Sequence, residues 1–246
     1  MKIRVAFAVM SLCAAGVAAG QELAIPPARY PDLPPAARDA AGFVPSGWVI
    51  AARRQGDLNG DGAADLVLLL RMADPANVLA VETDDETVAF DTNPHMLVVA
   101  FAEPDGGFRR IAGNRGLFLR PERPFTGDVP PNEDTIRLEH GSLVVFLEYL
   151  RGWASYRFRW QDGAMRLIGY DDAGASGGCM TRTSINYLTG RARLTAGYVD
   201  QDRTRTGWRR LRHLRRPSLD EIDLTEFSPE EAIAGEPLWC RARDEE

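Results

Sequence analysis

One short stretch of the chain, Gly56 to Leu70, is dense in acidic side chains and reads GDLNGDGAADLVLLL. Numbered from the first aspartate, oxygen-bearing side chains fall at positions 1, 3, 5 and 9, which are Asp57, Asn59, Asp61 and Asp65. Gly62 at position 6 permits a sharp turn, and Ala63 at position 7 offers its backbone carbonyl. Calcium prefers hard oxygen ligands of this kind, and a divalent cation offsets the repulsion among three carboxylates. The spacing therefore predicts a Ca²⁺ site.

The residues that follow the loop distinguish it from an EF-hand, which has a bidentate glutamate at position 12 where this chain has Leu68. The loop thus leads into an apolar strand and resembles the calcium loops of FG-GAP or VCBS-type repeats, found in integrin-like propellers and secreted bacterial proteins. That resemblance implies a loop that joins two strands and holds calcium, with water or another loop completing the shell. The alternative, plain hairpin turns at Asn59-Gly60 and Asp61-Gly62, explains the glycines but not the complete register.

The first residues of the chain, 1–20, have the features of a secretory signal peptide. Lys2 and Arg4 precede the apolar run VAFAVMSLCAAGVAA, and small residues precede Gln21. Leu12 stands before Cys13, where lipidation requires a small residue, so a lipoprotein is not expected. No later run is long and apolar enough for a transmembrane helix. We expect the mature protein to be periplasmic or secreted.

The charge of the chain argues against one class of partner. The formal net charge is −6, and without the two basic residues of the signal peptide 27 basic residues face 35 acidic ones, a net charge of −8. A chain this acidic is not expected to bind nucleic acid through general charge.

Two cysteines remain beyond the signal peptide, Cys179 and Cys240. In an oxidising compartment an even number of cysteines predicts a disulfide bond. The alternative is a pair of buried thiols.

Residues 47–246 are expected to form a single, mainly β domain with antiparallel meander sheets and few helices. Short apolar or alternating segments are separated by turn signals such as Asp162-Gly163. The run DLVLLLRM is continuous, as in a strand buried on both faces. The clearest meander begins at SLVVFLEYL, where aromatic residues alternate with Arg157 and Arg159. A sandwich, a barrel and a propeller-like arrangement all stay open.

Four segments are expected to lie outside the strands. The proline-rich residues 21–46 predict a linker or an extended arm, with order beginning near Gly47. Residues 73–94 and 120–134 are predicted loops. SPEEAIAG, Ser228 to Gly235, has an N-cap serine, a proline at the first position and a closing glycine, which predict a helix.

A serine hydrolase is the alternative enzymatic interpretation, centred on Ser176 in GASGG, a match to G-x-S-x-G. A nucleophilic serine needs a base, and the mature chain has only His95, His140 and His213, none in a recognisable catalytic or zinc-binding context. We therefore expect a loop fixed by Cys179 and assign no catalytic residue.

Two further motifs allow a binding interpretation. The basic run RTRTGWRRLRHLRR, residues 203–216, could meet an anionic partner, but the acidic segment SLDEIDLTEF follows it, so internal pairing is favoured. SINYLTG, residues 184–190, could line a surface, but Tyr187 and Leu188 suit a core strand better. The sequence as a whole predicts an exported calcium-binding β protein that binds or scaffolds an envelope protein or glycan. It leaves the oligomeric state open.

Overall fold

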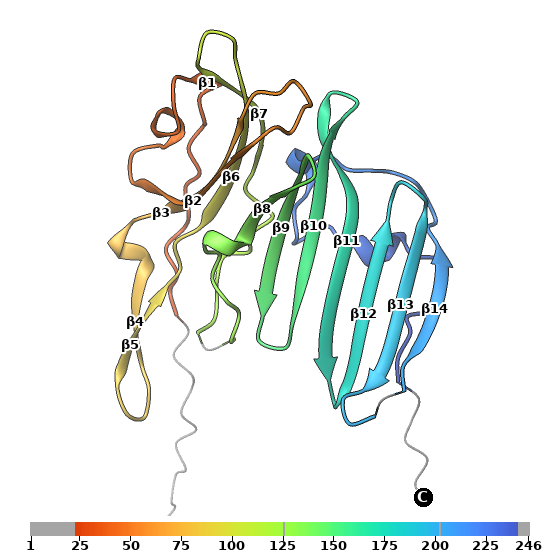
Figure 1. Cartoon of the computed structure of the whole chain (residues 1–246). Coiled ribbons are helices and arrows are strands. Elements are labelled where there is room, and N and C mark those ends of the chain that lie inside the picture. Colours follow the sequence, from red (N-terminus) through yellow and green to blue (C-terminus); the bar gives the residue numbers. More distant parts are fainter. Residues whose placement is uncertain (1–22, 125, 202, 241–246) are drawn as a thin grey trace, which may run out of the picture.

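The computed structural model describes residues 23–124, 126–201 and 203–240, and the chain there is mainly antiparallel β, as predicted (Figure 1). A five-stranded sheet has the order β1-β7-β6-β3-β2, and a seven-stranded sheet has the order β14-β13-β12-β11-β10-β9-β8. Strands β4 and β5 form a separate hairpin. The strands are β1 (Ala36–Ala37), β2 (Trp48–Gly56), β3 (Asp65–Met72), β4 (Val78–Glu82), β5 (Thr87–Asp91), β6 (His95–Ala102), β7 (Phe108–Asn114), β8 (Ile136–Glu139), β9 (Ser142–Tyr149), β10 (Gly152–Gln161), β11 (Ala164–Ser176), β12 (Cys179–Asn186), β13 (Arg191–Tyr198) and β14 (Arg205–Arg210).

Helical structure among the described residues consists of single 3₁₀ turns. They are η1 (Ala41–Phe43), η2 (Pro75–Asn77), η3 (Glu133–Thr135), η4 (Leu219–Glu221) and η5 (Pro229–Ala232). The predicted helix over 228–235 forms only in part, as the 3₁₀ turn η5, which begins at Pro229 after the N-cap Ser228 and ends at Ala232. The next residues pair instead with the chain leaving β14, since the Ala234 amide donates to the Arg210 carbonyl and Ile233 bridges to Leu211.

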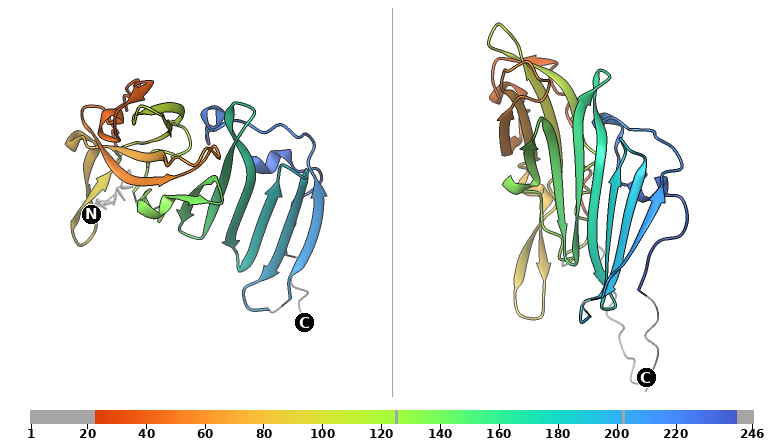
Figure 2. Two further views of the ribbon diagram at one scale, coloured as in Figure 1. Left: turned by 45° about the horizontal axis from the view of Figure 1, so that its top comes forward. Right: turned by 45° about the vertical axis from the view of Figure 1, so that its right-hand side comes forward.

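The seven-stranded sheet is a meander in which each strand pairs with its neighbour in sequence, which confirms the prediction made from β9 to β11. The two sheets lie side by side, with β8 near β2 (Figure 2). One apolar core joins them, because Val67 and Leu97 of the first sheet belong to the same buried cluster as Leu143 and Phe158 of the second. The two sheets therefore pack around a shared core.

Strand β3 is buried on both faces, as its continuous apolar run predicted. Val67 and Leu69 belong to the core shared with the seven-stranded sheet. Leu66, Leu68 and Leu70 point the opposite way, into a second buried cluster. Alternate side chains of β3 thus pack into two separate hydrophobic clusters, one on each face of the sheet.

The second layer is supplied by the proline-rich arm, which is ordered from well before Gly47. Phe43 is fully buried there, and Tyr30 and Leu33 pack against the same cluster. The arm adds β1 to the edge of β7 through Ala36 and Ala37. The expectation that order begins near Gly47 is wrong, because prolines restrict hydrogen bonding and φ but do not prevent apolar packing.

The prediction of a loop over residues 73–94 is also wrong, since β4 and β5 pair there from Val78 to Asp91. Their side chains alternate between partly buried and exposed, and the pair stands apart from the two larger sheets (Figure 1). Residues 120–134 form a loop where they are described, up to the start of η3.

The predicted disulfide joins Cys179 and Cys240, whose Cα atoms are 5.9 Å apart. Cys179 begins β12, and Cys240 ends the C-terminal segment that crosses behind the seven-stranded sheet (Figure 1). The bond closes a loop of 61 residues by sequence separation, so it restricts the unfolded chain and holds this segment close to the sheet.

Replacing both cysteines, Cys179→Ser with Cys240→Ser, is expected to lower the free energy of unfolding by about 2–4 kcal/mol, because the unfolded chain regains the entropy of an open loop. Urea denaturation of the variant and of the wild-type protein with and without reductant measures the difference. Equal midpoints for oxidised and reduced wild-type protein would contradict this role for the bond.

Candidate functional site

The acidic loop connects β2 to β3, and the side chain of Asp57 organises its first half. The Asp57 carboxylate accepts hydrogen bonds from the backbone amides of Asn59 at 3.2 Å, Gly60 at 2.6 Å and Gly62 at 2.9 Å. These bonds hold the pKa of Asp57 below its usual range. Gly60 and Gly62 have positive φ angles, which only glycine adopts at low cost, so the loop can wrap around the carboxylate.

Asn59 and Asp61 form the exposed outer part of the same loop. Asn59 Oδ1 accepts from the Asp61 amide at 2.9 Å, and Asn59 Nδ2 donates to Asp61 Oδ2 at 2.8 Å. The other oxygen of Asp61, Oδ1, accepts from the Ala63 amide at 2.7 Å. The predicted ligands at positions 1, 3 and 5 thus belong to one hydrogen-bonded turn.

Asp65, the predicted ligand at position 9, lies beneath this turn as the first residue of β3 and is fully buried. Its two oxygens accept from the backbone amides of Leu58 at 2.8 Å and Ala102 at 3.0 Å, which ties the loop to the end of β6. Burial is the main cause that raises the pKa of Asp65, and the charges of Asp61 and Asp57 raise it further. The three carboxylates are therefore near enough to repel one another.

The chemistry of these donors is compatible with calcium. A carboxylate oxygen has two acceptor sites, so an oxygen that accepts one amide N–H retains a lone pair for a cation. Three carboxylates, an amide oxygen and the Ala63 carbonyl are the hard donors that calcium takes. Within the described residues, however, no three or more His, Cys, Asp or Glu side chains gather closely enough to hold a metal ion. Calcium binding by this loop stays a prediction.

A neighbour that the sequence did not indicate is the turn between β8 and β9. A Cβ on Gly141 would lie 3.9 Å from the carbonyl oxygen of Asp57, and one on Gly56 would lie 3.1 Å from Leu138 Cδ1. His140 and Gly141 both have positive φ angles in this tight turn. The acidic loop therefore sits where the two sheets meet, a placement set by packing between strands distant in sequence.

Ser176, the alternative catalytic residue, occupies a hairpin turn. It is the last residue of β11, it pairs with Cys179, and Gly177 and Gly178 between them have positive φ angles. Ser176 is exposed, and no hydrogen bond among the described residues joins it to a histidine. The expected loop over residues 174–182 is therefore wrong except at Gly177-Gly178, because β11 continues to Ser176 and β12 begins at Cys179.

The basic run is paired internally only in part. Arg215 lies 3.3 Å from Glu221 of the acidic segment, as predicted, whereas Arg216 pairs with Asp162 at 3.2 Å. Arg205 and Arg210 on β14 have no ion pair within the part of the chain that the structure describes. In SINYLTG, Tyr187 is buried, as the core interpretation predicted, whereas Leu188 is 48% exposed and lies outside the core.

The outer face of the seven-stranded sheet, opposite the C-terminal segment, carries a row of arginine and aromatic side chains. Phe146 on β9 and Trp153 on β10 are stacked with ring centroids 5.6 Å apart. The Arg137 guanidinium lies 4.8 Å from the Phe146 centroid, and that of Arg182 lies 5.5 Å from the Trp153 centroid. Each end of the aromatic pair is thus capped by a cation.

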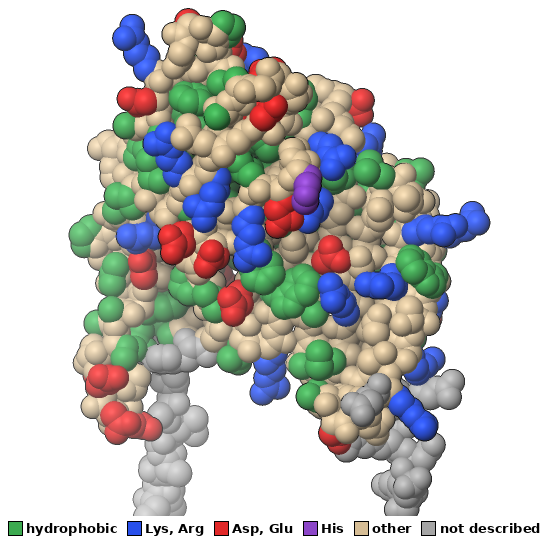
Figure 3. Space-filling view, in the orientation of Figure 1, with side chains coloured by type: hydrophobic (Ala, Val, Ile, Leu, Met, Phe, Trp, Pro, Cys, Tyr) green, Lys and Arg blue, Asp and Glu red, His purple; other side chains and the backbone are tan. Residues whose placement is uncertain are grey.

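The same face is basic and partly apolar beyond this row. The register places Arg191 and Arg193 on it, with Arg210 and Trp208 of β14 opposite them. Trp208 is 64% exposed. In this orientation, basic and hydrophobic side chains lie intermixed over the sheet (Figure 3). Sequence reasoning missed this face because its members come from different strands and meet only through strand register.

Two titratable groups outside the acidic loop, buried His95 and half-buried Asp172, have strongly shifted pKa values. Burial and, secondarily, the charge of Arg71 lower the pKa of His95 to about 4. Its Nε2 atom has no hydrogen-bond partner among the described residues, and its ring centroid lies 6.2 Å from that of Phe118. Burial raises the pKa of Asp172 to about 6, and Glu230 adds to that rise. His95 is thus a neutral core side chain.

Comparison of the chain with protein-family models, with curated proteins and with solved structures found no match. The FG-GAP or VCBS resemblance therefore stays a prediction. Among the described residues, no helix has the length and apolar character needed to cross a membrane. The predicted signal peptide, residues 1–20, lies outside the described residues.

The variant His95→Phe is expected to lose less stability in acid than the wild-type protein does. His95 is harder to protonate in the folded protein than in the unfolded chain, so neutral His95 contributes to the free energy of unfolding. This contribution is complete above about pH 6.5 and is lost as the pH drops toward about 4. The total loss is about 3 kcal/mol. The measurement is the difference in unfolding free energy between variant and wild type across that range. The exposed His213→Phe serves as control, and parallel curves for His95→Phe and wild type would contradict the assignment.

Proposed function

We propose that this chain is an exported calcium-binding β protein, with Ca²⁺ held by Asp57, Asn59, Asp61, Asp65 and the Ala63 carbonyl. The observation that carries the proposal is the placement of three mutually repelling carboxylates in one closed loop, one of them fully buried at the start of β3. A bound divalent cation would neutralise them. The role of the cation is structural, because the loop leads directly into β3, and both hydrophobic clusters pack against that strand.

The protein then acts by binding or scaffolding at the cell envelope, with an envelope protein or glycan as its partner. The disulfide is compatible with an exported location. The outer face of the seven-stranded sheet supports a binding role, because it combines exposed Trp208 with arginines in a protein of net negative charge. Tryptophan and arginine are enriched where protein surfaces bind partners.

Calcium added to chelator-treated protein is expected to raise the melting temperature. With a dissociation constant of about 10⁻⁴ M, as external modules have, about 10 mM calcium stabilises the folded state by about 2.7 kcal/mol. Asp61→Ala should abolish this increase, and so should Asp61→Asn, which keeps the size of the side chain but removes its charge. Asp105→Ala, in the exposed turn after β6, is the matched control and should respond as wild type does.

A wild-type melting temperature that does not change with calcium would overturn the metal site. An equal increase in melting temperature with magnesium would contradict selectivity of the site for calcium, since the smaller ion requires octahedral geometry and keeps its waters.

An array of glycans, peptidoglycan fragments and peptides distinguishes binding from hydrolysis. We expect retention of a ligand without turnover, and the same retention by Ser176→Ala. Turnover that disappears in Ser176→Ala, together with labelling of the wild type by a fluorophosphonate, would support the serine hydrolase in place of a binding protein.

A further inference from the structure

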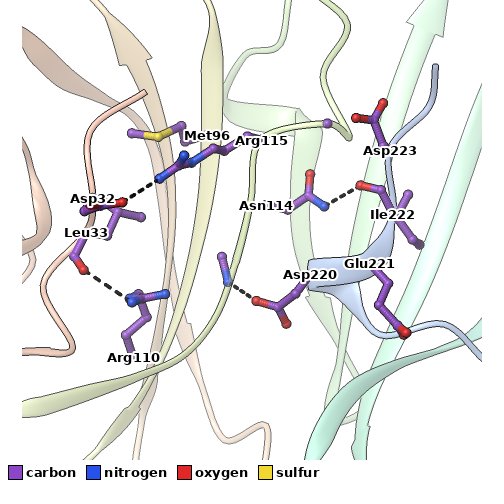
Figure 4. Close-up of a pocket in the computed structure, with 12 residues that line it drawn as sticks. Asp32, Leu33, Met96, Arg110, Asn114, Arg115, Asp220, Glu221, Ile222 and Asp223 are labelled. Carbon is purple, nitrogen blue, oxygen red and sulfur yellow. Dashed lines mark hydrogen bonds and ion pairs between the residues drawn. The ribbon is translucent and has the colours of Figure 1, made fainter. Parts of the chain in front are cut away.

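A cavity of ≈ 520 Å³ lies between three segments that are far apart in sequence (Figure 4). The N-terminal arm contributes Asp32 and Leu33, β7 and the residues after it contribute 110 and 113–116, and the C-terminal segment contributes 220–223. Its volume is within the range of about 300–1,000 Å³ usual for sites that bind small molecules. It is separate from the acidic loop, with which it shares no residue.

Buried hydrogen bonds hold the cavity together. Asn114 is buried at the end of β7, and its Nδ2 donates to the carbonyls of Leu219 and Ile222 at 2.6 and 2.7 Å. Its Oδ1 accepts from the Leu117 amide at 2.6 Å. The Leu224 amide donates to the Gly116 carbonyl at 2.9 Å. These hydrogen bonds therefore hold the C-terminal wall of the cavity in a defined position against the five-stranded sheet.

The two walls carry opposite charges that do not pair across the cavity. Arg110 and Arg115 lie on the side of the arm, whereas Asp220 and Asp223 lie on the C-terminal side (Figure 4). Among the described residues, the single ion pair between lining side chains is Arg115 with Asp32, at 3.4 Å on the arm side. Asp32 is fully exposed, so this pair contributes little. Arg115 Nη2 also donates to the Pro31 carbonyl at 2.9 Å, and the guanidinium lies 5.8 Å from the Tyr30 ring centroid, which leaves Nε and Nη1 of Arg115 for a ligand.

Each charged side chain keeps hydrogen-bonding capacity for a ligand. Arg110 donates from Nε and Nη2 to the carbonyls of Pro34 and Leu33, which leaves its Nη1 hydrogens. Asp220 accepts from the Gly113 amide through Oδ1, and Asp223 accepts from Thr225 through Oδ1, so Oδ2 of each is available. The Thr225 bonds hold the pKa of Asp223 below its usual range, so Asp223 is ionised at neutral pH.

Two glycines shape the cavity in different ways. A Cβ on Gly116 would lie 2.8 Å from Asp223 Cα, so glycine is required for the C-terminal segment to approach β7. Gly113 has no such restriction, because a Cβ there would lie 3.5 Å or more from every neighbour, including Arg110 Nη1 at 3.6 Å. A glycine within a strand often marks a place where a ligand approaches the backbone.

We propose that this cavity binds a small zwitterion, such as a short peptide, with its carboxylate against Arg110 and Arg115 and its ammonium against Asp220 and Asp223. Separated opposite charges of this kind match a molecule that carries both signs. Guanidinium groups bind carboxylates with a matching fork of N–H donors. The unpaired aspartate oxygens supply acceptors for an ammonium group.

The test measures binding of trialanine by isothermal titration calorimetry, beside N-acetyl-trialanine, which lacks the ammonium, and trialanine amide, which lacks the carboxylate. We expect trialanine to bind and each blocked peptide to bind at least ten-fold more weakly. Equal affinity of either blocked peptide and trialanine, or no heat from trialanine at millimolar concentration, would overturn the proposal.

Variants locate the binding. Asp223→Asn and Arg115→Gln remove one charge from each wall and should each weaken trialanine binding at least ten-fold, whereas Asp105→Asn should not. Gly113→Leu should block the cavity, with Gly113→Ala as its smaller control. Melting temperatures exclude a failure to fold, and wild-type affinity in both Asp223→Asn and Arg115→Gln would overturn the site.

Discussion

The fold depends on the burial of β3 from both sides. Leu66 to Leu70 are completely buried, so two separate layers must cover this strand. The seven-stranded sheet provides one layer and the proline-rich arm provides the other. Full burial of an aliphatic side chain contributes about 1.5–3 kcal/mol, so these five residues favour the docking of both layers strongly. The arm is consequently part of the domain and cannot be treated as a spacer.

This constraint also determines the position of the acidic loop. The loop begins at the end of β2 and ends at Asp65, the first residue of β3. Because Asp65 pairs within the sheet, it cannot turn outward unless β3 leaves the sheet. The Leu58 and Ala102 amides stabilise its carboxylate, while Asp57 and Asp61 oppose its charge. Loop electrostatics and strand packing are thus coupled at the Asp65 side chain, which is the physical basis of the proposal that a structural cation binds here.

The C-terminal segment, which follows β14, also restricts how the two sheets are arranged. It is joined to β12 by the disulfide and to β7 through Asn114, so it connects the two sheets at a distance from their shared strand interface. The cavity with opposite charges arises from this docking, since its walls belong to the arm, to β7 with the residues after it, and to the C-terminal segment. The outer face of the seven-stranded sheet, on the other side, stays uncovered by these segments.

The sequence by itself determined the local features: β3 as a buried strand, the meander from β9 to β11, the disulfide and the acidic loop that leads into β3. Each depends on residues close in sequence, on hydrophobic periodicity or, for the cysteines, on their number. It did not predict that the arm packs against β3, that β4 and β5 pair, or that the helix over 228–235 is a single 3₁₀ turn, because nonlocal packing or pairing outweighed local preference there. Only the tertiary structure decided that Arg137, Phe146, Trp153 and Arg182 form one row, and that Arg115 and Asp223 line one cavity. Such groupings follow from strand register and from the docking of distant segments, which no local pattern encodes.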